Sequence, residues 1–385
     1  MDKRIRLGFI YLWDSSWLGG VYYAQNLLKA LNTLPDKKKP IVDVHCLTDA
    51  DFQTLQERTK YPYLEKYLVR KIFWNRVYRK ILSFFSCRID DVDVITINAQ
   101  DDVIFPWFAG KNAQRFVMWK PDFQEKNLPA YFSKSELHKR DQEVREACLR
   151  HIPIVFSSSD SLSDFKKFYP EFCDNETHVV HFAASLPDFS KVNIKDVKQK
   201  YGIRKRYLFC ANQFWQHKNH LFLFKAFKRA LETGMDVQLV CTGKLADFRA
   251  PEYITEVKDF LVSNHLEKDI LVLGMIDKLE LFCLMKHSYA VIQPSLFEGW
   301  NTTVEDCKAM NKFIFLSDLN VHREQINQNV CFFNPHNEND LVQKLMNTIP
   351  AEEYFNYDDC VRQFGEDFFK VIEARMKKLQ TNMVQ

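Results

Sequence analysis

Residues 290–310 read AVIQPSLFEGWNTTVEDCKAM, and this stretch decides the fold. It starts with a short apolar run, passes through a polar loop and continues into a segment whose apolar positions have helical spacing. A short apolar strand that leads through a loop into a helix is the repeating unit of parallel α/β proteins. We therefore expect a strand over 290–293 and a helix capped by Thr302 or Thr303.

The same unit recurs on both sides of a polar, charged segment at 187–205, which we interpret as a linker. Strands are predicted at 5–13, 41–47, 92–98, 115–119, 153–157, 178–182, 207–211, 236–242, 270–273, 290–293 and 313–316. Helical stretches lie between many of them, so the fold class is α/β with two Rossmann-like parallel-sheet domains facing a cleft. The predicted parts are an N-terminal domain at 1–195, a C-terminal domain at 196–357, and a helix at 358–385 that packs across both domains.

Composition narrows the class of protein. The 385 residues carry 53 basic and 50 acidic side chains, a net charge of +3, which does not indicate a nucleic-acid partner. The ten cysteines form no C-x-x-C pair, so they read as thiols in a reducing compartment. The first apolar stretch is interrupted by Arg6, and no apolar run is long enough to span a membrane. We expect a cytoplasmic protein.

The loop after 290–293 carries the richest chemistry. A helix that begins near Thr302 presents free N–H groups and a partial positive charge, which suits a phosphate group. Glu298, Glu305 and Asp306 could accept hydrogen bonds from the hydroxyls of a sugar or a ribose. The alternative is an ordinary capped helix with acidic residues in its first turn.

Two further loops follow predicted strands. In 212–220, Lys218 is a candidate phosphate counter-ion, although a solvated lysine beside aromatic neighbours is the simpler interpretation. Gly19-Gly20 lets the backbone approach a ligand, or forms a plain tight turn. The pair lacks the third glycine of the dinucleotide-binding fingerprint, and Gly243 opens no P-loop, so an NAD-dependent enzyme is disfavoured.

Together these loops resemble a known family. The segment 295–306, followed by Ser317-Asp318 and 321–324 (VHRE), resembles the donor-site signature of family 4 (group 1) retaining glycosyltransferases, which have the GT-B fold. The loops 212–220 and 121–133 are similar to those of one branch of that family. The resemblance runs from residue 7 to about residue 325, and 294–324 is its most specific part.

The resemblance implies roles for individual residues. Glu298, Lys218 and Asp122 are the candidate catalytic residues, with Glu298 near the transferred sugar and Lys218 on the phosphates. Glu305 and Asp306 are equal candidates for the ribose contact. The family has a second glutamate after seven intervening residues, and this spacing falls on Asp306, a shorter acid, whereas Glu305 is a glutamate one position earlier. The remaining donor-binding candidates are Gly19, Gly20, Asn212, Gln213, Gly299, Trp300, Asn301, Thr302 and Thr303. No metal and no cofactor is expected apart from the nucleotide-diphosphate sugar, which is the donor substrate.

Two positions depart from the family pattern. Gln213 stands where the family usually has an arginine five residues before Lys218, which removes one cation from the diphosphate site. The stretch after the strand at 115–119 is Lys120-Pro121-Asp122, without the family's histidine. Asp122 or Lys120 is the candidate for lining the acceptor side, which the resemblance places in the domain at 1–195, with the donor in the domain at 196–357.

The resemblance implies transfer of a hexose from a nucleotide-diphosphate sugar to the hydroxyl of a glycan or lipid-linked acceptor, with retention of configuration. The usual setting of this branch is surface polysaccharide or lipopolysaccharide assembly. Because no nucleophile for a two-step route is visible, we favour attack by the acceptor on the same face. The alternatives are a small soluble acceptor, or a GT-B-fold binding or scaffold protein without turnover.

The stretch 73–85 bears on location. Its apolar residues fall on one half of a helix, and Arg76, Arg79 and Lys80 fall on the other half. Such a helix either lies on an anionic membrane surface, which would make the protein peripheral on the inner membrane face, or packs in the core with a solvated basic face.

Overall fold

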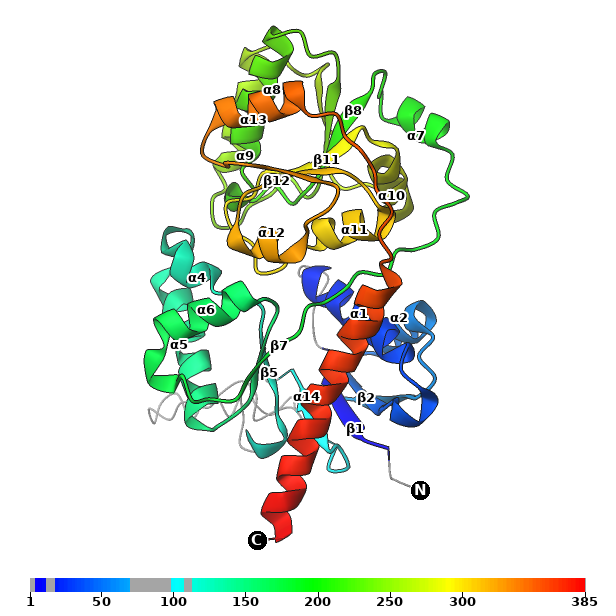
Figure 1. The fold of residues 1–385 in the computed structure, drawn as a ribbon, viewed down its shortest axis with the longest axis vertical. Helices are drawn as coiled ribbons and strands as arrows, with labels where there is room; N and C mark the ends of the chain where they lie inside the picture. Colours follow the sequence, from blue (N-terminus) through cyan, green and yellow to red (C-terminus); the bar gives the residue numbers. More distant parts are fainter. Residues whose placement is uncertain (1–3, 12–17, 70–97, 107–112, 385) are drawn as a thin grey trace. The chain divides into compact units, whose positions relative to one another are not determined.

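The computed structural model describes residues 4–11, 18–69, 98–106 and 113–384 (Figure 1). The chain divides into two compact units, each of which is described by itself. Unit 1 comprises 1–126, 133–183 and 358–385, and unit 2 comprises 127–132 and 184–357. The basic stretch 73–85, and with it the predicted membrane contact, lies outside the described residues, as does almost all of the predicted strand at 92–98.

Unit 1 is an α/β unit built on parallel strands. Its strands are β1 (Arg6–Ile10), β2 (Ile41–Cys46), β3 (Leu64–Leu68), β4 (Val103–Phe105), β5 (Met118–Lys120), β6 (Ile154–Phe156) and β7 (Thr177–Val179). Its helices are α1 (Leu18–Asn32), α2 (Asp49–Thr59), α4 (Gln124–Asn127), α5 (Lys134–Leu149), α6 (Ser159–Phe168) and α14 (Asp358–Val384). The strand orders are β3-β2-β1-β4 and β5-β6-β7, and a parallel bridge between Ile104 and Phe116 links the two sheets.

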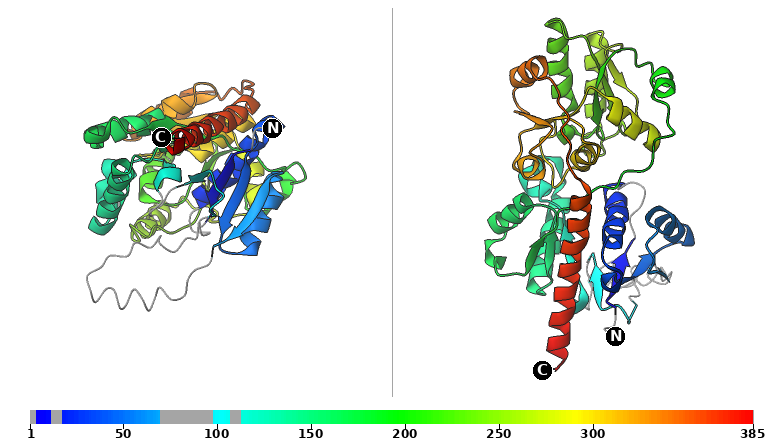
Figure 2. Two further views of the ribbon diagram at one scale, coloured as in Figure 1. Left: turned by 90° about the horizontal axis from the view of Figure 1, so that it is seen from below. Right: turned by 45° about the vertical axis from the view of Figure 1, so that its right-hand side comes forward.

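The C-terminal helix α14 packs along α1, as the right-hand view in Figure 2 shows. A Cβ on Gly365 would lie 2.3 Å from the carbonyl oxygen of Ala30, so only glycine permits this close approach. Phe364 contacts Tyr23 with ring centroids 5.8 Å apart, and Phe368 contacts Phe105 at 4.9 Å. The last 27-residue helix is therefore part of the core of unit 1.

Unit 2 contains a six-stranded parallel sheet with helices on both faces. Its strands are β8 (Tyr207–Ala211), β9 (Gln238–Thr242), β10 (Ile270–Val272), β11 (Ala290–Gln293), β12 (Ile314–Ser317) and β13 (Val330–Phe333), in the order β10-β9-β8-β11-β12-β13. Its helices are α7 (Ile194–Lys200), α8 (His220–Glu232), α9 (Tyr253–Ser263), α10 (Lys278–His287), α11 (Thr302–Met310), α12 (Asn320–Gln325) and α13 (Glu338–Asn347). The order reverses between β8 and β11, which makes their carboxyl ends the topological switch point.

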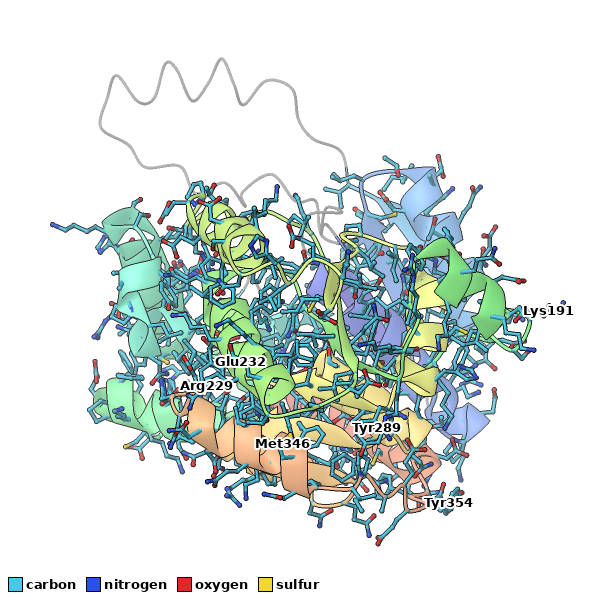
Figure 3. All side chains as sticks on the ribbon, turned by 90° about the horizontal axis from the view of Figure 1, so that it is seen from above. Lys191, Arg229, Glu232, Tyr289, Met346 and Tyr354 are labelled. Atoms are coloured by element: carbon cyan, nitrogen blue, oxygen red, sulfur yellow. The ribbon has the colours of Figure 1, made fainter. Side chains whose placement is uncertain are left out.

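Alternate residues of each strand enter different halves of the core. Leu208 and Leu239 pack under α8, α9 and α13, whereas Phe209 and Val240 pack under α7, α10 and α11. Helices α8 and α13 lie side by side on their face, where Figure 3 labels Arg229 and Met346. The continuous apolar character of these strands follows from burial on both faces of the sheet.

The units divide the chain differently from the predicted boundaries. Unit 2 begins at 184 rather than 196, because the expected linker at 187–205 contains α7 and packs against α10. The segment 358–385 groups with unit 1 through α1. Strands β3, β4 and β13 were not expected; β4 has three residues, too few to show a period.

Two local predictions were wrong. Gly19 and Gly20 lie in the first turn of α1, not in a preceding glycine turn, because the helix already starts at Leu18. The N-cap of α11 is Asn301 rather than Thr302 or Thr303, since the helix already begins at Thr302 and the Asn301 carboxamide oxygen accepts from two backbone N–H groups of the first turn.

Candidate functional site

Two loops of unit 2 meet at the switch point of the sheet. Residues 212–219, the Lys218 loop, follow β8, and residues 294–301, the Glu298 loop, follow β11. The N–H of Leu296 donates to the carbonyl oxygen of His217 at 2.8 Å, and Asn219 Nδ2 donates to the carbonyl oxygen of Pro294 at 3.2 Å. The two loops are therefore fastened together before any ligand arrives.

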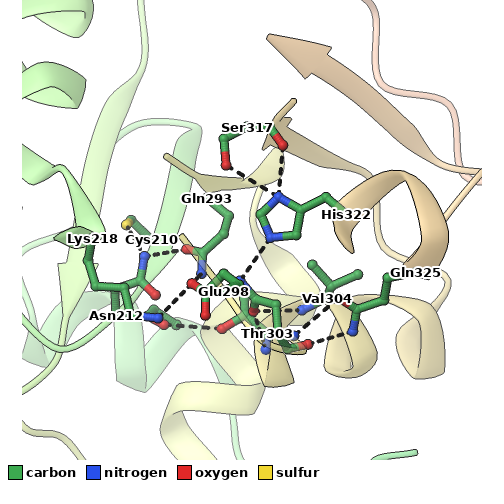
Figure 4. Close-up of polar contacts among 12 residues, drawn as sticks. Cys210, Asn212, Lys218, Gln293, Glu298, Thr303, Val304, Ser317, His322 and Gln325 are labelled. Atoms are coloured by element: carbon green, nitrogen blue, oxygen red, sulfur yellow. Dashed lines mark hydrogen bonds and ion pairs between the residues drawn. The ribbon is translucent and has the colours of Figure 1, made fainter. Parts of the chain in front are cut away.

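The charged centre of this site is an ion pair between the two loops (Figure 4). Lys218 Nζ lies 2.6 Å from Glu298 Oε1, with the side chains 15% and 10% exposed. Gln293 Nε2 also donates to Glu298 Oε1, at 3.4 Å, and Asn212 Nδ2 donates to Gln293 Oε1. The structure thus brings together Lys218, Glu298 and Asn212, which the sequence had placed in separate motifs, and holds a cation and a carboxylate at the sheet edge.

The N-terminus of α11 lies beside this pair, and side-chain hydrogen bonds hold its first turn in place. Asn301 Oδ1 accepts hydrogen bonds from the N–H groups of Thr303 and Val304, at 2.9 and 3.3 Å. The hydroxyl of Thr303 donates to the carbonyl oxygen of Ala211 at 3.2 Å, which anchors the turn to β8. Because the cap uses two of the N–H groups, a phosphate would approach the exposed end at Thr302, where the helix dipole is positive.

Two side chains of helix α12 contact Asn301, the N-cap residue of α11. Gln325 accepts from the N–H of Asn301 at 3.2 Å and donates to its carbonyl oxygen at 2.8 Å. His322 is fully buried, with Nδ1 2.8 Å from the carbonyl oxygen of Ser317 and Nε2 3.5 Å from Asn301 Nδ2. Burial lowers the pKa of His322, which keeps the imidazole neutral.

The two candidate ribose acids have different surroundings. Glu305 is buried, with one oxygen bonded to Lys308 and Gln325, both at 2.9 Å, and the other bonded to the hydroxyl of Tyr357 at 2.5 Å. Tyr357 in turn accepts from the N–H of Ala184 at 2.7 Å. Glu305 is thereby engaged in holding the unit together.

Asp306 points to a different environment. Burial raises the pKa of its carboxyl group to about 7, and the nearby Lys278 at the start of α10 opposes that shift. The side chain is half-buried and no hydrogen bond is found for it within the described residues. A group that keeps its acceptors available is the one that can bind a ligand hydroxyl.

Other predicted donor residues surround this centre. Gly299 is buried, and the Trp300 ring lies beneath Lys308, whose Nζ is 6.0 Å from the ring centroid. Gln213 Oε1 accepts from the N–H of Lys244 at 3.1 Å, so its side chain fastens the loop after β9.

The remaining predicted site residues belong to unit 1. Asp122 follows β5, is half-buried, and accepts from the N–H of Gln124 at 2.9 Å. Burial raises its pKa, and the nearby Lys120 opposes that shift. Lys120 itself is buried and pairs with Glu125 at 2.6 Å. Gly19 is exposed and Gly20 is buried in the first turn of α1.

Several residues of the site carried no assigned role in the sequence. Gln325 and Tyr357 had no local signal, because each contacts the site from a distant part of the chain: Tyr357 is 52 residues from Glu305. Gln293 ends β11 directly before the Glu298 loop, but its position in an apolar strand gave no sign of its contact with Glu298. His322 stood within the VHRE motif, but its buried contact with Asn301 depends on how α12 packs.

A cavity of about 90 Å³ lies beside the later turns of α11, away from Glu298 and Lys218. It is lined by Cys307, Lys308, Lys312, Gln325, Ile326, Asn327, Gln328, Asn329 and Phe355. Over the described part of the chain, no group of three or more His, Cys, Asp or Glu side chains is arranged to hold a metal ion. Nor does any helix there have the length and apolar character to cross a membrane. The absence of a metal from the reaction stays a prediction.

Comparisons with known proteins define the class of this site. The family model for group 1 glycosyl transferases matches residues 204–349, which include both loops of the site. The O-antigen chain mannosyltransferase RfbU of Salmonella typhimurium is 24% identical over 160 residues, which are 41% of this chain. The match spans 42% of that relative's length. Residues 204–349 are thus similar to the group 1 glycosyl transferase domain.

Solved structures extend the comparison to the whole chain. Anabaena HepE in complex with UDP and glucose matches with a TM-score of 0.61 at 14% identity, over 99% of this chain and 98% of that one. A glycosyltransferase from Rickettsia africae has a TM-score of 0.59 at 13% identity, over 99% and 97%. WaaG, a glycosyltransferase involved in lipopolysaccharide biosynthesis, has 0.53 at 12%, over 96% and 95%. The predicted GT-B fold with two Rossmann-like domains is confirmed.

Proposed function

We propose that this protein is a retaining glycosyltransferase that moves a hexose from a nucleotide-diphosphate sugar to a hydroxyl of a glycan or lipid-linked acceptor. The observation that carries the proposal is the ion pair between Lys218 and Glu298 beside the N-terminus of α11, at the switch point of the sheet. A cation, a helix dipole and a carboxylate at one place suit a diphosphate and the sugar attached to it.

The leaving group explains the cation. When the bond between the sugar and the diphosphate breaks, the sugar gains oxocarbenium character and the diphosphate gains negative charge. Lys218 and the end of α11 at Thr302 stabilise that charge where it develops. Glu298, released from Lys218 by the phosphate, then accepts hydrogen bonds from the hydroxyls of the sugar.

The structure favours Asp306 over Glu305 as the acceptor for the ribose hydroxyls. Glu305 already has three partners, and rotating it toward a ligand would leave Tyr357 and Gln325 without theirs. Asp306 keeps its oxygens available and lies near Lys278 at the carboxyl edge of the sheet. These contacts support Asp306, the shorter acid, as the proposed ribose contact.

Asp122 is proposed as the acceptor-side residue of unit 1. Its raised pKa brings the carboxyl group closer to the range in which it can exchange a proton with a hydroxyl. With no nucleophile identified, we propose that the acceptor hydroxyl attacks the anomeric carbon on the face that the diphosphate leaves, which retains the configuration. The new carbon–oxygen bond forms as the bond to the diphosphate breaks, and the hydroxyl proton passes to the departing phosphate oxygen. No metal step is included.

The proposed setting is surface polysaccharide or lipopolysaccharide assembly. It is supported by the similarity to RfbU, an O-antigen chain mannosyltransferase, and by the fold shared with WaaG. HepE, whose structure contains UDP and glucose, supports a nucleotide-sugar donor.

The test begins with thermal-shift measurements against UDP-, GDP-, dTDP- and ADP-sugars, because a ligand that binds the folded state raises its melting temperature. Donor hydrolysis or transfer is then measured with the best donor for the parent, Glu298→Ala and Lys218→Ala. We expect turnover by the parent and losses of 100-fold or more in both variants.

Two outcomes would contradict the proposal. Binding without hydrolysis or transfer by the parent, tried with polysaccharide and lipid-linked acceptors, would point instead to a GT-B-fold binding protein. Binding of none of the four donor classes would remove the nucleotide-sugar assignment itself.

A further inference from the structure

Two side chains of the short helix α12 contact Asn301, the last residue of the Glu298 loop. His322 and Gln325 are one helical turn apart and both contact Asn301 (Figure 4). Gln325 binds the backbone of Asn301 on both sides, whereas His322 faces its carboxamide. All three residues are buried, with no more than 4% of each exposed.

We propose that His322 is a positioning residue for the donor's diphosphate: its neutral ring fixes the orientation of the Asn301 carboxamide, and thereby the first turn of α11. This inference rests on the proposed function, because it concerns the phosphate site of that reaction. His322 does not touch the donor; it acts through Asn301.

The hydrogen bonds determine which ring nitrogen carries the proton. His322 Nδ1 lies 2.8 Å from the carbonyl oxygen of Ser317, which can only accept, so Nδ1 carries the hydrogen. Nε2 of the neutral ring then offers a lone pair, and it faces Asn301 Nδ2 at 3.5 Å. The amide nitrogen of Asn301 is therefore held toward α12.

The orientation of the amide decides the cap. With Nδ2 directed to His322, Oδ1 is directed to the N–H groups of Thr303 and Val304. If the carboxamide turned over, its NH₂ group would face two N–H donors, and all four donors would lose acceptors in a buried place. The turn that carries Thr302 would then move away from Lys218.

Charged groups on the elements around His322 influence whether its ring is protonated. Glu298 and Asp318 favour a protonated ring, whereas burial and Lys218 oppose it, and burial has the largest effect. The oxygen of Ser317 accepts from the ring from the strand side. The neutral ring with hydrogen on Nδ1 is thus the form that satisfies every contact.

The experiment compares two substitutions that each keep one half of the imidazole. His322→Gln places an amide oxygen near the position of Nε2, where it can accept from Asn301. His322→Asn places an amide N–H near the position of Nδ1, where it can donate to Ser317, but leaves Asn301 Nδ2 without an acceptor. Isothermal titration measures the dissociation constant of whichever of UDP, GDP, dTDP or ADP the parent binds.

We expect His322→Asn to raise that dissociation constant about tenfold and His322→Gln to change it less than about threefold, at matched folded fractions. Equal weakening by both variants, or none by either, would overturn the proposal, because a merely structural histidine has no preference between the two halves. If the parent binds none of the four nucleotides, the proposed function fails instead.

A second measurement does not depend on the variants folding. Nitrogen-15 spectra of the histidine-labelled parent report the tautomer, with the signal of His322 assigned by its loss in either variant or by its slow exchange in the buried site. We expect hydrogen on Nδ1 at pH 7. Hydrogen on Nε2, or on both nitrogens, would contradict the proposal.

Discussion

Units 1 and 2 each hold a lysine–glutamate pair at the carboxyl edge of a parallel sheet, buried in unit 1 and partly buried in unit 2, and the two pairs have the same length. Lys120 and Glu125 lie 2.6 Å apart in unit 1, and Lys218 and Glu298 lie 2.6 Å apart in unit 2. The first pair joins residues five positions apart, whereas the second joins loops 80 positions apart. The contacts are alike but their neighbours are not.

The neighbours decide what each pair can do. Glu125 has a second cation, Arg140, at 3.6 Å, and Lys120 also lies over the ring of Phe123, so this pair has contacts beyond its own ion pair. In the Lys218–Glu298 pair, Glu298 also accepts from the neutral Gln293 at 3.4 Å, but within the described residues no second cation pairs with it, and the pair lies beside the N-terminus of α11. A buried pair with extra partners is structural, and a pair at a dipole is one that an anionic ligand can open.

The largest effect should come from breaking the pair in unit 2. Lys218→Met should lower kcat for transfer about 10²- to 10³-fold, since it removes one charge that stabilises the leaving diphosphate. Steady-state rates with the donor found by thermal shift measure this. Lys228→Met, from the exposed pair with Glu232, is the matched control and should be within twofold of the parent. Equal rates for Lys218→Met and the control would show that the Lys218–Glu298 pair contributes no more to transfer than an exposed pair does.

Breaking the pair in unit 1 should show mainly in stability. Lys120→Met leaves Glu125 as a buried carboxylate with only the longer contact to Arg140, so we expect the free energy of unfolding to fall by about 3 kcal/mol. Urea unfolding followed by circular dichroism measures it. Lys139→Met, from the exposed pair with Glu143, should change it by less than about 0.5 kcal/mol. An unchanged midpoint in Lys120→Met would show that this pair does not support the fold.

The comparison extends to the two adjacent acids of α11. Asp306→Asn should weaken donor binding about tenfold, because the ribose hydroxyls lose one of the two carboxyl oxygens, and Asp306→Glu should recover part of the loss. Titration calorimetry with the nucleotide alone and with the nucleoside diphosphate sugar measures both. Full-strength binding by Asp306→Asn would return the ribose role to Glu305.

The pH dependence of the free energy of unfolding tests the carboxyl group of Asp306 without any ligand. Its pKa is raised from 3.8 to about 7 in the folded chain, so the folded state binds the proton more tightly than the unfolded state. The parent should therefore lose stability from this group as the pH rises from about 4 to 7. Asp306→Asn should melt higher than the parent at pH 8 and close to it at pH 4.5. A difference that does not vary with pH would show that Asp306 is not held in a low-dielectric site.

The smallest expected effect concerns position 213, where this chain has a glutamine and the resembled family usually has an arginine. Gln213→Arg should tighten nucleoside diphosphate binding about threefold at low salt and make it more sensitive to ionic strength, because it adds a positive charge to the Lys218 loop. Loss of the Gln213 contact with Lys244 limits the gain. Weaker binding would mean that this contact matters more for the loop than the charge does for the phosphate.

The sequence predicted the sheet of unit 2 more closely than that of unit 1. The strands at 207–211 and 290–293 match β8 and β11 residue for residue, because uninterrupted apolar runs mark strands buried on both faces. In unit 1 the three-residue strand β4 was missed, and the glycine pair was read as a turn although it begins α1. Short strands and glycine-initiated helices leave little local pattern to read.

By itself the sequence determined the α/β class, the two-part organisation and the residue types of the donor site, because apolar periodicity and motif spacing are local properties of the chain. Tertiary structure alone decided which acid is occupied and which is available. Glu305 and Asp306 are neighbours in sequence, but α11 directs one toward Gln325 and Tyr357 and leaves the other near Lys278. It also decided that His322 faces Asn301, since a contact between distant segments depends on packing rather than on any local preference.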